Sequence, residues 1–136
     1  MKKLQYALIG LVIMLPLMLS SCTDRNYWEE EPLYGNWFMN NYDPDLGSYE
    51  CCFSFYADGT CDITYTYDFF PQYNNSYTVN YRVSGDLYYN AVIDMWGFYP
   101  DGAFMDNSYQ ASINYNTLYL YGIEGDYTGL NLVFTR

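Results

Sequence analysis

The sequence contains no histidine and very few basic residues. Of its 136 residues, 5 are Lys or Arg and 16 are Asp or Glu, so the formal net charge is −11. Such an acidic surface repels phosphate backbones and anionic headgroups, which excludes nucleic acid as a partner. Without histidine, a serine or cysteine nucleophile lacks its usual base. We therefore expect a binding protein with no enzyme activity and no cofactor.

Two kinds of acidic site stay open as alternatives. Paired carboxylates can support glycoside hydrolysis, and five acids are expected near one end of the fold. These are Asp94, Asp101, Asp106, Glu124 and Asp126. An acidic chain brings carboxylates together by default, which favours a non-catalytic interpretation. The segment Asp43–Glu50 spaces oxygen ligands as calcium sites do, but Pro44 and its short length favour a solvated loop.

Cysteine is scarce, with four in the chain, and three of them fall in "YECCFSFYADGTCDITYTY". If Gly59 takes the left-handed position of a three-residue loop, Phe55 pairs with Cys61 and Phe53 with Ile63. That register puts Cys51 on the order of 13 Å from Cys61, too far for a disulfide. Zinc is disfavoured because histidine and paired Cys-x-x-Cys spacing are absent. The segment predicts a β-hairpin with free cysteines, and no metal site is expected.

The N-terminus has the pattern of a secretory signal. Lys2 and Lys3 precede an apolar stretch, and small residues lead to Cys22. "LSSC" resembles the lipobox of bacterial lipoproteins, which implies lipidation of Cys22 and a membrane anchor. We expect a signal peptide over 1–21 and a lipidated acidic tether over 22–32. Cleavage would remove both lysines and change the net charge from −11 to −13. An acidic tether also resembles the surface-export signals of Bacteroidota lipoproteins.

From residue 33 to 136 the pattern predicts one all-β domain. Tyr, Phe, Val, Ile and Thr alternate in short runs separated by Gly, Asn, Asp and Pro. The expected strands are 34–41, 49–56, 60–69, 77–83, 87–96, 109–114, 117–122 and 129–136. Connections alternate between long and tight, so all long loops fall at one end of an up-and-down meander. We therefore predict an eight-stranded antiparallel up-and-down barrel with one decorated mouth, which leaves no exposed sheet edge.

This pattern resembles the lipocalins, and more closely the lipocalin-like domains of Bacteroidota lipoproteins. "LYGNW" carries Gly35 and Trp37 as a Gly-x-Trp at the start of the first strand, and the chain closes on "LNLVFTR". In lipocalins a late arginine packs over the early tryptophan, which implies that Arg136 covers Trp37 at the closed end. The resemblance spans 33–136 but lacks a recognisable final helix and a disulfide.

Aromatic residues are the strongest remaining signal for function. An eight-stranded interior can be filled or can hold one small ligand, and the two are left open here. Alternation predicts a set of inward residues: Trp37, Phe53, Phe55, Tyr65, Tyr67, Tyr81, Tyr89, Tyr109, Leu118, Leu120, Leu132 and Phe134. Another set is expected on exposed loops at the mouth: Phe69, Phe70, Tyr73, Phe98, Tyr99, Phe104 and Met105. A third set is expected to face outward from the strands: Tyr88, Trp96, Tyr119 and Tyr121.

Two functions follow from these sets. In the first, an outer-membrane lipoprotein binds a small apolar or amphipathic ligand through the aromatic mouth, and exposure at the cell surface is left open. In the second, a filled barrel presents its aromatic loops to an envelope protein or a glycan. An apolar cavity reached through the mouth would favour the first.

Overall fold

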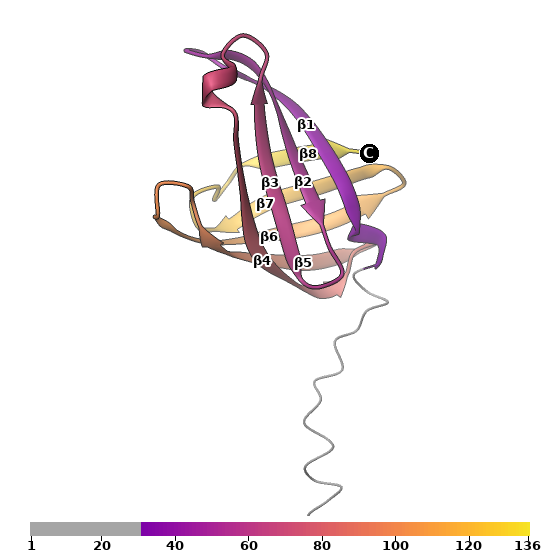
Figure 1. Ribbon diagram of the computed structural model, residues 1–136. Coiled ribbons are helices and arrows are strands. Elements are labelled where there is room, and N and C mark those ends of the chain that lie inside the picture. The colour runs from indigo at the N-terminus through magenta and orange to yellow at the C-terminus, as the bar shows by residue number, and fades with distance from the viewer. Residues whose placement is uncertain (1–30) are drawn as a thin grey trace, which may run out of the picture.

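A computed structural model describes residues 31–136, which form a closed barrel in the order β1–β2–β3–β4–β5–β6–β7–β8 (Figure 1). Every neighbouring pair is antiparallel, including β1 with β8. The strands are β1 Gly35–Asp43, β2 Gly47–Phe55, β3 Thr60–Tyr67, β4 Asn75–Asp86, β5 Asn90–Phe98, β6 Phe104–Asn114, β7 Thr117–Glu124 and β8 Asn131–Thr135. Two short 3-10 helices accompany them, η1 Glu31–Leu33 and η2 Pro71–Tyr73. The predicted fold class is confirmed.

Alternation along each strand produces the core. In β5, Ala91, Ile93 and Met95 are buried, while the residues between them are partly exposed. Successive side chains of a strand point to opposite faces, so every second residue enters the barrel. The interior is therefore built from one face of all eight strands.

The β2–β3 hairpin has the predicted register. Phe55 pairs with Cys61 and Phe53 with Ile63, and Gly59 has φ 84° in the turn. Cys51 lies opposite Tyr65, far along the ladder from Cys61. All three cysteines of the described chain are free, and Cys51 and Cys61 are buried as small apolar core residues.

At the base of the barrel, Arg136 lies over Trp37, as the sequence predicts. The guanidinium carbon is 4.6 Å from the centroid of the indole ring. The Trp37 side chain is fully buried, and its Nε1 donates to the carbonyl of Leu33 in η1 at 2.7 Å. Arg136 also donates to the carbonyl of Pro32 at 3.3 Å. η1 and the C-terminal arginine thus cover the base together.

The β4–β5 connection differs from the prediction. β4 continues to Asp86, and the turn is Leu87–Tyr89 rather than residues 84–86. The Asp86 carboxylate accepts the Tyr88 backbone N–H at 2.8 Å, which stabilises a turn three residues later in the sequence than expected. Leu87 then packs into the base, while Tyr89 is 83% exposed instead of pointing inward.

Two mouth connections are shorter than predicted. The first is the turn Pro44–Leu46, because the Asp43 carboxylate accepts the backbone N–H groups of Asp45 and Leu46 at 2.8 and 3.0 Å. The other is residues 99–103, because β6 begins at Phe104. The contrast between long and short loops is therefore smaller than the sequence suggests, although the topology inferred from it is right.

The barrel closes weakly between β1 and β8. β1 has nine residues and β8 has five, and the two strands share one registered pair, Phe38 with Thr135. The part of β1 nearer the mouth, Met39–Asp43, therefore has no registered partner in β8. In Figure 1, β8 lies across β1 at a steep angle rather than alongside it.

Candidate ligand site

The lower half of the interior is filled by large side chains. Phe53 and Phe134 pack with their rings tilted by 38° and their centroids 4.7 Å apart, and Phe55 meets Tyr81 edge-on at 5.0 Å. The Tyr81 hydroxyl donates to the carbonyl of Tyr56 at 2.7 Å, so this ring is fixed at both ends. Large side chains therefore fill the base and form a floor.

Above this floor lies a cavity of about 140 Å³. Its apolar lining consists of Met39, Cys51, Phe53, Leu130, Leu132 and Phe134, and its polar lining consists of Asn41, Tyr49, Tyr65, Tyr109 and Tyr127. Asn41 and Leu130 are exposed, so the cavity reaches solvent beside the open part of the β1–β8 seam. Its size is close to that of engineered apolar cavities that bind benzene.

The cavity wall is electrically neutral. Burial, and then the neighbouring Cys51 and Tyr127, raise the pKa of Tyr65 far above its usual value of 10.0. Burial and Tyr127 likewise raise the pKa of Tyr109, and burial raises the pKa of the Cys51 thiol to about 12. No Lys, Arg, Asp or Glu is among the lining residues. The wall can donate or accept hydrogen bonds through phenols but offers no charge to an ion.

The loop between β7 and β8 covers the cavity with Tyr127. The Tyr127 hydroxyl lies 3.4 Å from the Tyr65 hydroxyl across the barrel, and its ring is 6.4 Å from that of Tyr109. Thr128 forms a bridge with Gly122, where a Cβ atom would collide with the Tyr127 carbonyl oxygen. A glycine at position 122 therefore lets the loop fold back against β7.

A second set of contacts fixes the start of this loop. The buried Asn107 side chain accepts the backbone N–H of Asp126 at 2.8 Å. The Asp126 carboxylate accepts the Tyr99 hydroxyl at 2.8 Å, which ties the loop to the β5–β6 connection. Asp126, one of the acids considered for catalysis, thus has a structural partner.

The aromatic residues expected at the mouth do not line the cavity. Phe69 and Tyr73 are exposed at the β3–β4 connection, and Phe98 packs edge-on against Phe104 at 5.4 Å between exposed strand ends. Phe70 is at the margin of exposure, 6.3 Å from Tyr73 between ring centroids. Tyr99 is half-buried and holds Asp126, as described above.

The predicted position of Met105 is wrong. The sequence places it on an exposed loop, whereas the structure places it in β6, opposite Gly97, with 2% exposure. β6 begins earlier than its alternation suggests, because Phe98 and Phe104 pair across the hairpin and extend the ladder. Met105 is therefore a core residue.

The cavity contains residues that sequence reasoning missed. Tyr49 shares the inward face of β2 with Cys51 and Phe53, so alternation alone would have found it. Tyr127 and Leu130 come from an irregular loop, whose path depends on Gly122 and Asn107. No periodic signal marks them.

No family model, curated protein or solved structure matches the chain. Within residues 31–136 there is no group of three or more Cys, Asp or Glu side chains suited to a metal ion. The same residues include no helix of the length and apolarity required to cross a membrane. Cys22, the expected signal peptide and most of the expected tether lie outside the described residues. The function must therefore be argued from the chain's own chemistry.

Proposed function

We propose that this protein is a cell-envelope lipoprotein whose lipocalin-like barrel binds a small apolar or amphipathic ligand without catalysing a reaction. The observation that carries the proposal is the cavity of about 140 Å³ above the filled floor. Ligand pockets combine an apolar wall with a few polar groups, and this wall joins Met, Leu and Phe side chains to tyrosine hydroxyls.

The cavity size sets the ligand class. A volume near 140 Å³ suits one aromatic ring or a short acyl segment, well below the space that a drug-sized molecule needs. The lack of charge in the wall disfavours a buried carboxylate or ammonium group. An amphipathic ligand would bury its apolar part against Phe53 and Leu132 and leave its polar end at the seam beside Asn41.

Native mass spectrometry of the protein purified from its own host tests this proposal by looking for a retained small molecule. The variant Leu132→Phe should fill the cavity and abolish retention, since Leu132 lines it and is half-buried. Val92→Phe adds similar bulk to the half-buried outer face of β5 and should retain the ligand. Retention by Leu132→Phe, or no bound molecule in the wild type, would count against the proposal.

The anchor is tested separately through Cys22. Cys22→Ala should abolish lipidation and leave an uncleaved or unanchored precursor, because the thioether forms at this sulfur. Detergent partitioning and intact mass report the change. A variant that still partitions into detergent with unchanged processed mass would show that the lipoprotein interpretation is wrong.

A second function is favoured by the exposed aromatic residues at the mouth. Phe69, Phe98 and Phe104 are 74%, 62% and 59% exposed, and Phe98 and Phe104 pack together as an exposed apolar pair. Exposed apolar side chains that are grouped in this way mark contacts with a partner. In this alternative the loops contact an envelope protein or a glycan. Cross-linking from position 98 or 104 in intact cells, with position 42 as an exposed control on β1, distinguishes the two.

A further inference from the structure

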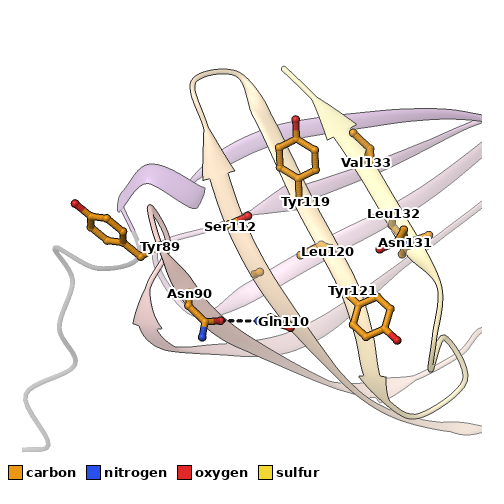
Figure 2. Close-up of a pocket in the computed structure, with 11 residues that line it drawn as sticks. Tyr89, Asn90, Gln110, Ser112, Tyr119, Leu120, Tyr121, Asn131, Leu132 and Val133 are labelled. Atoms are coloured by element: carbon orange, nitrogen blue, oxygen red, sulfur yellow. Dashed lines mark hydrogen bonds between the residues drawn. The ribbon is translucent and has the colours of Figure 1, made fainter.

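The outer wall of the barrel has a groove of about 170 Å³, separate from the interior cavity (Figure 2). It runs over β6, β7 and β8, and the exposed ring of Tyr89 stands at one end, in the β4–β5 turn. Outward residues pair across the strands in two rows. One row is Gln110, Tyr121 and Asn131, and the other is Ser112, Tyr119 and Val133.

Two tyrosines form the centre of the groove. Tyr119 and Tyr121 are two residues apart on β7, so their Cα atoms lie about 7 Å apart and their side chains project from the same face. They are 45% and 42% exposed, and Figure 2 shows both standing out from the wall. Their ring surfaces are thus available to a ligand lying along the strand.

Neutral polar side chains flank the Tyr121 ring. Tyr121 has an amide on each side, from Gln110 and Asn131. The Gln110 Nε2 donates to Asn90 Oδ1 at 2.9 Å, and this bond orients the side-chain amides of Gln110 and Asn90. The amides of Gln110 and Asn90 each have donor and acceptor positions that this bond does not use, so both can also form hydrogen bonds with a hydroxylated ligand.

The groove has no charged lining residue. A neighbouring hollow at the base, which includes Tyr88, Tyr115 and Tyr119, has none either. Acidic residues number 16 in the chain, so this is a neutral strip on a strongly acidic protein. Charge complementarity therefore favours a neutral ligand, and the surrounding acids repel anionic ones.

We propose that this groove binds a neutral oligosaccharide of pyranose units. The C–H face of a pyranose packs on an aromatic ring, and its hydroxyls need amide and hydroxyl partners at the ring's edge. Tyr121 between Gln110 and Asn131 provides this arrangement. A protein partner would favour a contiguous apolar core, whereas here amides flank the Tyr121 ring on both sides. This site is distinct from the cavity and from the aromatic residues at the mouth.

The test measures binding of maltoheptaose, cellohexaose and mannohexaose to the full chain as its host processes it. An amine-oxide detergent is used, because a maltoside would itself supply sugar. Calorimetry should detect binding of at least one of these oligosaccharides and no binding of an oligogalacturonate, which is anionic. The two-site variant Tyr119→Ala, Tyr121→Ala should weaken binding by at least about fivefold per ring.

Matched variants distinguish ring stacking from folding. Tyr121→Phe keeps the ring and should bind almost as wild type, and Tyr42→Ala removes a more exposed tyrosine from β1 and should have no effect. Loss of affinity in the two-site variant with an unchanged melting temperature supports the proposal. Binding of none of the three neutral oligosaccharides, equal affinity in the two-site variant, or a protein partner that alone depends on Tyr119 and Tyr121 overturns it. Ligand retention by the cavity is unaffected by these variants, so the two proposals fail independently.

Discussion

At the residue scale, the Trp37 side chain makes several contacts at once at the base of the barrel. Its ring is fully buried, its Nε1 has a carbonyl partner, and its face carries the Arg136 guanidinium. A cation over an indole contributes electrostatic attraction beyond the apolar area that the ring buries. The base is therefore stabilised by one contact between the two ends of the domain.

Trp37→Ala should lower the free energy of unfolding by about 3–5 kcal/mol, because it leaves a cavity in the floor. Arg136→Ala should lower the free energy of unfolding by about 1 kcal/mol and the melting temperature by about 4 °C, because this residue is exposed. The double variant should lose less than the sum, because the arginine has lost its ring. Thermal melts of the three variants measure this, and fully additive losses would contradict the observed contact.

The cysteines should differ in reactivity according to burial. Cys51 is 1% exposed with its pKa raised to about 12, and Cys61 is fully buried, whereas Cys52 is partly exposed. Alkylation of the folded protein near neutral pH should modify Cys52 first and the other two at least tenfold more slowly, because the thiolate is the nucleophile. Peptide mapping by mass spectrometry identifies each site. After unfolding without reductant all three should react, and fewer would indicate a disulfide.

At the element scale, the β7–β8 loop determines access to the cavity. It crosses the mouth because Gly122 has no Cβ and because Asn107 and Tyr99 hold Asp126. Loops fixed by a few polar contacts open at lower free energy than core strands do. This loop is the segment most suited to admit a ligand.

Gly122→Ala should displace this loop, because the new methyl group would collide with the Tyr127 carbonyl. Such overpacking costs about 1–3 kcal/mol. Hydrogen exchange should become faster at residues 125–130 and stay unchanged in β2 and β3. Ile123→Ala, at an exposed neighbouring position, is the control and should leave the loop amides protected. Unchanged exchange in Gly122→Ala would mean that the loop does not pack on β7.

At the scale of the whole molecule, buried phenols make the barrel sensitive to alkali. Burial is the main cause that raises the pKa values of Tyr65, Tyr77 and Tyr109 above 10.0, the value of an exposed tyrosine. These side chains stay neutral in the folded protein at a pH where the unfolded chain loses the protons. The unfolded state is thus favoured as pH rises above 10.

The stability contributed by these tyrosines should be complete below pH 10 and fall above it. The loss should be about 1.4 kcal/mol per pH unit for each tyrosine that ionises only on unfolding. Denaturant melts at pH 8, 10 and 11, with tyrosinate absorbance followed in parallel, measure this. Simultaneous ionisation of all tyrosines near pH 10 with the fold intact would contradict the burial of these rings.

Strand alternation and turn chemistry made most of the barrel predictable. The hairpin register followed from matching apolar faces across Asp58-Gly59, and the closed-end pair followed from Gly-x-Trp and a terminal arginine. Turns stabilised by aspartate were harder, because Asp43 and Asp86 each shifted a connection by accepting backbone N–H groups. The shift of the turn after Asp86 moved Tyr89 out of the core.

Within the strands the sequence by itself determined which residues face inward, because the period of two is a local property of each strand. At the strand ends it did not, as Tyr89 and Met105 show. It also determined the charge and the supply of aromatic rings. Only the tertiary structure decided that the floor is filled, that a cavity remains beside the β1–β8 seam, and that Tyr121 stands between amides of β6 and β8. The physical reason is that these features depend on strand lengths, cross-strand register and the path of one irregular loop. None of these has a periodic signature in the chain.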